Sequence, residues 1–318
     1  MNKIIYEMQM LERGHSNFDD LDYFVFAAGS DGRAYEVLSR LSSAAATEYI
    51  IFNFDERLSR KKSDDTIFDY QKISVPKLNP INCAIMDPSS SLPDIDRFGF
   101  KETDRIGIDI SCFTKPYFYF LMKLLREKYQ IETLSVFYTE PKSYFFPGGI
   151  FGAFHSSSGP LSVIEMPGFS GLENMRSRQK LIILLGFDGE LSREIKEDVS
   201  PQDTIVVNGF PSYSPKFKDI SLVTNERLIG DDDTQVRYAR ANNPFDVYNV
   251  LEDISRNSDN ETVLNIAPLG TKPMALGACL FALHNPEVRI MYPLPEQYEE
   301  KYSDEFWNSW IYSLPLSI

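Results

Sequence analysis

The chain has 318 residues, of which 43% are hydrophobic and 25% charged, enough to fill a packed core in each of two domains and to exclude a disordered or fibrous protein. Its formal net charge of −14 comes from 32 basic and 46 acidic residues, and a field of that sign disfavours binding to duplex nucleic acid. A small anionic ligand in one local basic pocket remains compatible with this charge.

The positions of cysteine and histidine bear on metal sites and disulfide bonds. The three cysteines and three histidines have no metal-ligand spacing, so we expect no metal, no cofactor and no disulfide framework. The N-terminal segment has no secretory apolar core, and runs such as FYFLMKLL are too short to span a bilayer. We therefore expect a cytoplasmic protein with no membrane partner.

Strand-like and helix-like runs alternate along the chain. The strand-like runs are 22–28, 48–54, 105–111 and 133–138 in the first half and 180–186, 203–209, 262–267 and 287–292 in the second. They are continuously apolar rather than alternating, which is typical of parallel strands covered on both faces. Helical spacing is found at 33–41, 116–129, 244–256 and 274–284. The pattern predicts an α/β fold with one Rossmann-like layer structure in each half.

Short motifs recur between the halves at nearly one offset. Gly29-Ser30-Asp31-Gly32 matches Gly186-Phe187-Asp188-Gly189, and Thr114-Lys115-Pro116 matches Thr271-Lys272-Pro273, both 157 residues later. Two weaker matches lie 155 residues apart (Asn53 and Asn208) and 154 residues apart (Tyr138-x-x-Pro141-x-x-Tyr144 and Tyr292-x-x-Pro295-x-x-Tyr298). The repeat predicts two tandem duplicated Rossmann-like domains at 1–143 and 179–318, joined by a connecting segment at 144–178.

Several segments differ between the halves. The excursions 55–104 and 209–260 have diverged and are candidates for ligand or partner specificity. The connection 144–178 holds six of the 17 glycines, which predicts an irregular β-hairpin or, alternatively, a mobile flap over a pocket. The helix-like run 274–284 is apolar nearly all round, so we expect it at an interface between domains or chains. The stretch 305–318 carries both tryptophans and is expected to pack on the second domain, with protein docking as the alternative.

The Thr-Lys-Pro element is the sharpest chemical signal. In both halves it follows a buried strand and opens a helix, where proline suits the first turn and places Lys115 and Lys272 at the helix N-cap. A lysine is electrostatically unfavourable beside the positive end of the helix dipole, so its recurrence suggests that the charge is used. Together with Thr114 and Thr271 and free backbone N–H groups, these lysines predict a cradle for a phosphate. Surface exposure or pairing with a carboxylate is the alternative.

The Gly-x-Asp-Gly turns and two strand-end polar residues are weaker candidates. The turns occupy the loop after the first strand, where α/β folds bind ligands, and Ser30, Asp31, Phe187 and Asp188 lie there. Each aspartate is first of all a good helix N-cap. Asp109 and Asn265 lie near the ends of the third strand-like runs, and Asp109 is a candidate base if the protein is an enzyme. No nucleophile triad, Walker A or zinc-protease motif is present.

The run Leu269-Gly270-Thr271-Lys272 resembles the G-G-T-K motif of CARF domains, which are Rossmann-like nucleotide sensors of bacterial antiviral defence. A chain with two such units is similar to the SAVED arrangement. The resemblance implies that Thr271 and Lys272 line a cyclic-oligonucleotide pocket between two Rossmann-like units, and that Thr114 and Lys115 do so through the repeat. It also implies that Ser30 and Phe187 approach the ligand. The double glycine of the motif is replaced by Cys112-Phe113 and Leu269-Gly270.

Three functions remain open at this point. The first is a nucleotide-recognising sensor or accessory subunit of a defence system, with an anionic nucleotide in the cleft between the halves and a protein partner or self-association for output. The second is a nucleotide-processing enzyme, such as a ring nuclease or nucleosidase, using Asp109, Lys115 and Lys272. The third is a scaffold without a ligand that assembles with proteins.

Overall fold

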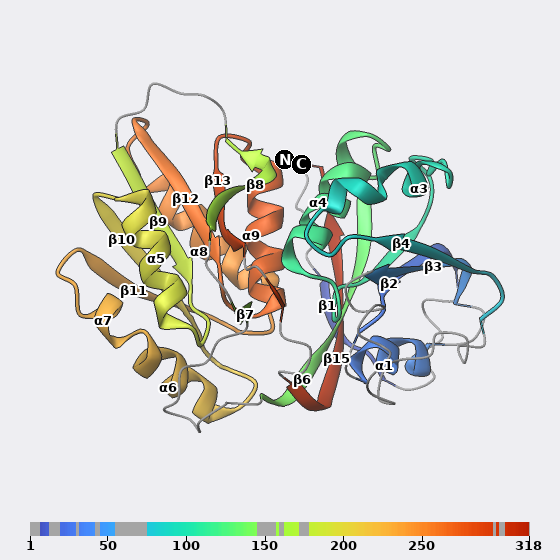
Figure 1. Cartoon of the computed structure of the whole chain (residues 1–318), viewed down its shortest axis with the longest axis horizontal. Coiled ribbons are helices and arrows are strands. Elements are labelled where there is room, and N and C mark those ends of the chain that lie inside the picture. Colours follow the sequence, from blue (N-terminus) through green and yellow to red (C-terminus); the bar gives the residue numbers. More distant parts are fainter. Residues whose placement is uncertain are drawn as a thin grey trace. The chain divides into compact units, whose positions relative to one another are not determined.

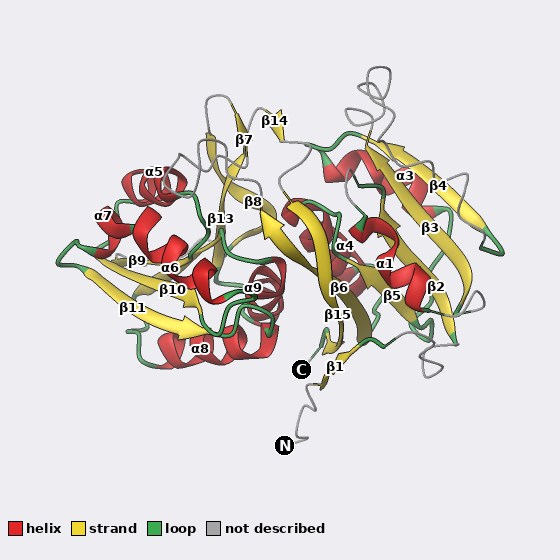
Figure 2. Ribbon diagram, turned by 90° about the horizontal axis from the view of Figure 1, so that it is seen from below, coloured by secondary structure: helices red, strands yellow, loops and turns green. Residues whose placement is uncertain are grey.

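The computed structural model describes residues 7–12, 20–29, 32–41, 45–54, 75–144, 157–158, 162–171, 178–294, 297–298 and 303–317. The chain divides into two compact units, which are named here unit 1 (Met1–Tyr144 and Ser303–Ile318) and unit 2 (Phe145–Tyr302). Each unit is built around one large, mostly parallel β-sheet with helices packed against it (Figures 1 and 2).

The sheet of unit 1 has seven strands in the order β1-β15-β6-β5-β2-β3-β4. Five strands are parallel, and their bounds are β2 (Leu21–Ala27), β3 (Ala46–Phe54), β4 (Leu78–Cys83), β5 (Ile106–Asp109) and β6 (Thr133–Tyr144). The long strand β15 (Ser303–Pro315) pairs antiparallel with β6. The short strand β1 (Glu7–Met10) pairs antiparallel with β15 and forms the edge of the sheet.

The sheet of unit 2 has six strands in the order β11-β10-β9-β12-β13-β8. Its parallel strands are β9 (Arg178–Leu184), β10 (Asp203–Gly209), β11 (Thr234–Ala239), β12 (Thr262–Pro268) and β13 (Arg289–Leu294). The strand β8 (Ser162–Ser170) pairs antiparallel with β13, and a separate two-stranded ladder joins β7 (Ser157–Ser158) to β14 (Gln297–Tyr298).

The parallel strands of both sheets follow the same order. Numbered along the chain within each unit, they lie as 3-2-1-4-5, and an antiparallel strand flanks the fifth strand in both cases. This is the order of the first five strands of a doubly wound Rossmann sheet (3-2-1-4-5-6), with a topological switch point between the first and fourth strands. The predicted fold class, α/β with two Rossmann-like sheets, is confirmed.

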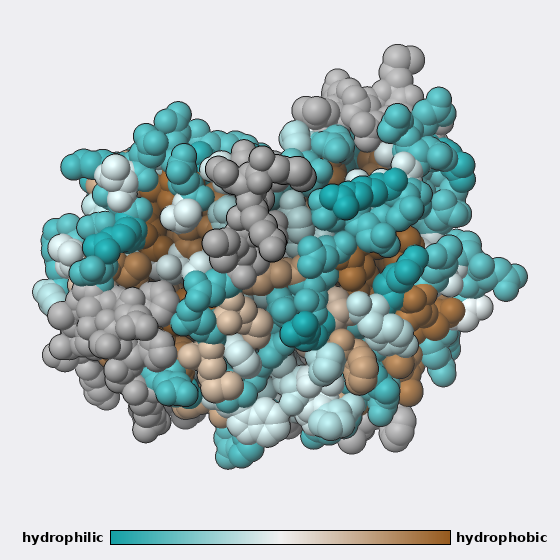
Figure 3. All heavy atoms as spheres, turned by 180° about the vertical axis from the view of Figure 1, so that it is seen from behind, coloured by the Kyte–Doolittle hydropathy of each residue, from teal (hydrophilic) through white to brown (hydrophobic). Residues whose placement is uncertain are grey.

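Helices connect the parallel strands. In unit 1 they are α1 (Arg33–Arg40), the 3-10 turn η2 (Pro88–Ser91), α3 (Leu92–Asp96) and α4 (Lys115–Glu127). In unit 2 they are α5 (Gly189–Val199), α6 (Pro215–Thr224), α7 (Glu226–Ile229), α8 (Pro244–Arg256) and α9 (Lys272–His284). None of the described helices is long and apolar enough to cross a membrane. On the face shown in Figure 3, hydrophilic residues cover most of the described surface, as expected for an acidic protein.

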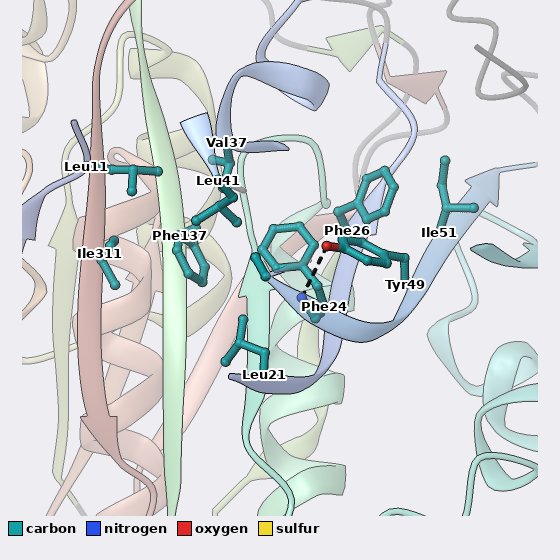
Figure 4. Packing of buried hydrophobic residues seen from close by; sticks show 12 residues of the cluster. Leu11, Leu21, Phe24, Phe26, Val37, Leu41, Tyr49, Ile51, Phe137 and Ile311 are labelled. Carbon is teal, nitrogen blue, oxygen red and sulfur yellow. Dashed lines mark hydrogen bonds between the residues drawn. The ribbon is translucent and has the colours of Figure 1, made fainter. Parts of the chain in front are cut away.

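Both faces of the unit 1 sheet are filled by large apolar side chains. On one face, Phe24 and Phe26 of β2 meet Val37 of α1 and Phe137 of β6, and Ile311 of β15 belongs to the same cluster (Figure 4). On the other face, the rings of Phe52 and Phe54 contact Phe113 and Tyr117 at the start of α4, with centroid distances of 4.8–6.5 Å. The beginning of α4 is therefore anchored by aromatic packing.

The helix α9 is buried along its whole length after the first residue, from Pro273 to Leu283. Part of this burial comes from α8 of the same unit, because a Cβ on Gly277 would lie 2.2 Å from the carbonyl oxygen of Pro244. Glycine is needed there for the two helices to approach so closely. The position of this helix at an interface between domains or chains stays a prediction.

The antiparallel strands β8 and β15 each join the sheet of the unit that does not contain the parallel strand before them in the chain. The strand β8 follows β6 of unit 1 along the chain but joins the sheet of unit 2, and β15 follows β13 of unit 2 but joins the sheet of unit 1. The expectation that the C-terminal stretch packs on the second half is therefore wrong. Its hydrogen-bonding partner is β6, and the Trp310 indole N–H donates to the buried Glu140 carboxylate at 2.7 Å. Residues 303–318 thus belong to a different compact unit from the range 179–318 in which we expected them.

Two parallel strands, β4 and β11, lie inside the excursions where no strand was expected. Both are edge strands of their sheets, and each has several exposed or half-buried residues. An edge strand does not need a continuous apolar run, because one of its sides has no neighbouring strand to bury it.

Candidate functional site

The loops after the first and fourth parallel strands meet closely at the switch point of each sheet. In unit 1, a Cβ on Gly29 would lie 2.4 Å from Cys112 Sγ; in unit 2, a Cβ on Gly186 would lie 2.7 Å from the Leu269 carbonyl oxygen. The two pairs are separated by the same 157 residues as the sequence motifs. Only glycine allows this approach, which brings the start of the following helix beside the first loop.

The Thr-Lys-Pro elements begin these two helices, as predicted from the sequence. Thr114 is the N-cap of α4 and Thr271 is the N-cap of α9, so the lysines occupy the first helical position and the prolines the second. The prediction that the lysines are the N-caps is wrong by one residue. Each threonine has the extended backbone of an N-cap residue, with ψ near 160° in both copies, and in unit 2 its hydroxyl also caps the helix.

In unit 2 the threonine hydroxyl is fully used by the fold. Thr271 Oγ1 accepts a hydrogen bond from the Met274 N–H at 3.3 Å and donates one to the Ala241 carbonyl oxygen. The Tyr213 hydroxyl donates to the same carbonyl at 3.2 Å. Thr271 therefore caps α9 and ties its start to the loop that follows β11.

In unit 1 the equivalent hydroxyl has no hydrogen-bond partner among the described residues. Thr114 is 7% exposed, its Oγ1 atom is buried, and the structure gives that atom no hydrogen-bond partner. It does not cap its own helix, so the Tyr117 N–H in the first turn receives no bond from it. A buried hydroxyl without a partner costs about 1–3 kcal/mol, which makes this position unusual unless something else binds there.

Lys115 lies next to this hydroxyl in the chain and is half-buried. Among the described ion pairs, none includes Lys115. Burial lowers the pKa of Lys115 to about 7, because the protonated amine loses solvation and no carboxylate of the described residues compensates it. A bound anion would supply that missing opposite charge.

Hydrogen bonds hold the preceding loop of unit 1 in place. Asp109, the last residue of β5, accepts from the Ser111 N–H at 2.8 Å, and Ser111 Oγ accepts from the Thr139 N–H of β6 at 2.8 Å. The Thr139 hydroxyl in turn lies 2.8 Å from the Ser309 hydroxyl of β15. The loop that leads to Thr114 is thereby fixed to two further strands, including the C-terminal one. Asp109 lies at the strand end, as predicted.

Of the two Gly-x-Asp-Gly turns, the structure describes the second in full and the first only in part. Asp188 is the N-cap of α5, and its Oδ1 accepts from the Leu191 N–H at 3.2 Å, so the predicted capping role is confirmed. Phe187 lies in the same loop and contacts the ring of Phe217, with a centroid distance of 5.6 Å. Ser30 and Asp31 lie outside the described residues.

Asn265 is not the counterpart of Asp109 in unit 2. It lies in the middle of β12, three residues before the strand ends, and its amide donates to the Gln179 side chain at 2.8 Å, towards the start of β9. Asn265 precedes Thr271 by six residues, whereas Asp109 precedes Thr114 by five. In strands, such a one-residue difference places side chains on opposite faces, so the two residues are not equivalent.

The arrangement in unit 1 suits an anion. It combines a cation, a free hydroxyl and the positive end of a 13-residue helix whose second residue is proline. The first-turn N–H groups of Lys115 and Tyr117 have no acceptor within the helix itself, as is general at helix N-termini. Among the described residues, no group of three or more His, Cys, Asp or Glu side chains is placed to hold a metal ion.

Comparisons with known proteins do not identify a family for this chain. No family model and no curated protein matches the chain. One similar solved structure is a type III CRISPR defence DNA nuclease activated by cyclic oligoadenylate, with 9% identity, a TM-score of 0.49 and coverage of 85% of this chain. The chain spans 65% of the length of that nuclease chain. Another is a universal stress protein from Pseudomonas aeruginosa UCBPP-PA14, with 10% identity, a TM-score of 0.24, and coverage of 87% of this chain and 95% of that one. At such identities and scores, neither protein says what this chain binds.

Proposed function

We propose that unit 1 binds a small phosphorylated ligand at the start of α4, and that the protein is a nucleotide-recognising sensor. The observation that carries the proposal is the buried hydroxyl of Thr114, for which the described part of the chain supplies no partner, although its equivalent in unit 2 has two. A phosphate oxygen is a suitable acceptor for such a hydroxyl, in place of a backbone group.

The neighbouring charges support an anionic rather than a neutral ligand. Lys115 is a cation beside the positive end of a helix, a placement that costs stability unless an anion is bound. Net charge elsewhere on the protein is strongly negative, so a local anion site needs such a concentrated donor set. Backbone N–H groups, a hydroxyl and a lysine together form the donor set that phosphate groups commonly meet in proteins.

The finer assignment rests on the sequence resemblance. The Leu269-Gly270-Thr271-Lys272 run resembles the CARF motif, so we propose a linear or cyclic oligonucleotide as the ligand class and antiviral defence as the setting. The first copy, Thr114 and Lys115, is the better candidate for the ligand site, because the Thr271 hydroxyl is already hydrogen-bonded to Ala241 and Met274. A tandem duplication remains our explanation for the equal strand orders.

A thermal-shift screen of linear and cyclic nucleotides tests this proposal. We expect a phosphodiester nucleotide to raise the melting temperature of the wild-type protein and to have a much smaller effect on Thr114→Val. A charge-assisted hydrogen bond contributes about 1.5–3 kcal/mol, so the variant should bind roughly ten- to a hundredfold more weakly. Thr271→Val is the matched control and should keep its ligand response. Equal responses of both variants would contradict the proposed site.

A nucleotide-processing enzyme is the second candidate function. The pKa of Lys115, lowered to about 7, leaves part of this amine neutral near physiological pH, where it can accept a proton. Asp109 lies five residues upstream at the end of β5. Mass spectrometry of the ligand after incubation with the protein decides between the two functions, because a sensor returns the ligand intact and an enzyme changes it.

A further inference from the structure

Unit 2 exposes two aromatic rings that contact each other. Phe210 directly follows β10, and Tyr238 is the residue before the last one of β11. They are 52% and 51% exposed, their ring centroids are 6.2 Å apart, and their planes meet at 74°. The backbone at this point is fixed, because the Phe210 N–H donates to the Ala239 carbonyl oxygen at 2.7 Å.

Exposed aromatic pairs of this kind need an explanation. Large apolar side chains are exposed at five described positions (Met10, Phe210, Val223, Tyr238 and Trp307). Single exposed residues are ordinary, but these two rings are adjacent and lie at the carboxyl ends of parallel strands, the end of the sheet at which α/β proteins bind ligands, although away from the switch point between β9 and β12. Two rings that meet nearly at a right angle form a corner. A flat ring system can stack on one face of this corner and place its edge against the other ring.

Cations beside the corner indicate the charge of the occupant. Lys218 Nζ lies 5.5 Å from the centroid of the Phe210 ring and 3.0 Å from the Asp219 carboxylate on the same helix. Arg240, two residues after Tyr238, is 58% exposed and pairs with Asp246 at 2.8 Å. Both ion pairs are partly exposed to solvent, which weakens them, so both cations can also meet an incoming anion.

We propose that Phe210 and Tyr238 form a stacking site for the base of a nucleoside phosphate, with Lys218 facing its phosphate. Aromatic rings stack on every base with little sequence preference, and a nearby lysine complements the backbone charge. The site lies on unit 2 and uses none of the residues proposed to bind phosphate in unit 1. Its failure and the failure of the proposed function are therefore separate results.

Ligand-detected NMR with adenosine 5′-monophosphate tests the stacking site. The experiment uses the Lys115→Met protein, so that binding in unit 1 does not contribute. We expect saturation transfer to the adenine protons, and dissociation constants at least about tenfold higher for Phe210→Ala and Tyr238→Ala. Phe210→Trp should restore binding, and Trp307→Ala, which removes an exposed aromatic from unit 1, should not change it. Circular dichroism checks that the variants fold; both positions are half exposed, so folding should hold.

Two comparison ligands distinguish a base site from a simple anion site. Ribose 5-phosphate carries the phosphate without a base and should bind much more weakly than adenosine 5′-monophosphate. Lys218→Ala should weaken adenosine 5′-monophosphate more than it weakens adenosine. The proposal is overturned if ribose 5-phosphate binds equally well, if the two alanine variants bind like the parent protein, or if the adenine protons receive no saturation at millimolar ligand.

Discussion

Replacing Lys115 by methionine removes the charge at the start of α4 while keeping most of the apolar stem. The folded protein lowers the pKa of this amine from 10.5 to about 7, because burial disfavours the protonated form. Below the folded pKa, both the folded and the unfolded chain carry the proton, and the full cost of burying the charge is present. As the pH rises towards 10.5, the cost disappears, since the amine is then neutral in both states.

The expected effect is large enough to measure. A change of one pKa unit corresponds to about 1.4 kcal/mol, and partial solvent screening of this half-buried side chain reduces the total to about 2–3 kcal/mol. Near neutral pH, Lys115→Met should therefore be more stable than the wild type, with a melting temperature about 5–10 °C higher for a unit of this size. From about pH 6 to about pH 9, the wild type should regain about 1–2 kcal/mol relative to the variant.

Urea denaturation across this pH range, with scanning calorimetry as a second probe, measures both quantities. Lys123→Met is the matched control, because Lys123 lies on the same helix but pairs with Glu127 at 2.7 Å, and its loss should not raise stability. A variant at Lys115 that is less stable than the wild type, or a difference that does not change with pH, would refute the reasoning. The lysine would then belong to a structural contact.

Replacing the two threonine N-caps by valine should change the free energy of unfolding in different ways, as measured by urea unfolding. Thr114→Val should leave the unliganded protein as stable or about 1 kcal/mol more stable, because it removes a buried hydroxyl that has no partner among the described residues. Thr271→Val should destabilise it by about 1–2 kcal/mol, because the helix cap and the hydrogen bond to the Ala241 carbonyl are lost. Gly29→Ala should cost about 1–3 kcal/mol by the same measurement, since its Cβ would lie 2.4 Å from a sulfur atom; a neutral change would mean that the two loops are not in contact. Trp310→Phe should destabilise unit 1 by about 1–3 kcal/mol, because the Glu140 carboxylate loses a buried N–H donor, and unchanged stability would contradict the assignment of β15 to the first sheet.

Much of the fold was predictable because central parallel strands are apolar on both faces. The runs at 22–28 and 180–186 became β2 and β9, and the start of α8 at Pro244 followed from the preference of proline for the first turn. The edge strands β4 and β11 were missed, since their exposed positions leave no continuous apolar signal. The partner of β15 was also missed, because strand pairing between distant segments leaves no local pattern in the sequence.

The candidate site was predictable in position but not in its differences between copies. The Thr-Lys-Pro repeat located both helix starts correctly, apart from the one-residue shift of the N-cap. What the sequence does not show is that a carbonyl group of the loop after β11 reaches Thr271, while no described residue does the same for Thr114. The Ala241 carbonyl belongs to the excursion 209–260, one of the segments in which the halves diverge most.

Proton uptake on ligand binding tests the central claim most directly. Isothermal titration calorimetry with a phosphodiester ligand, such as adenylyl-adenosine or cyclic tetra-adenylate, in buffers of different ionisation enthalpy counts the protons bound, and a phosphodiester does not itself titrate near neutral pH. An anion beside Lys115 should raise the pKa of this amine, so the wild type should take up about half a proton per ligand near pH 7, and Lys115→Met should take up none. Binding without proton uptake, or the same uptake in the variant, would place the ligand away from the start of α4.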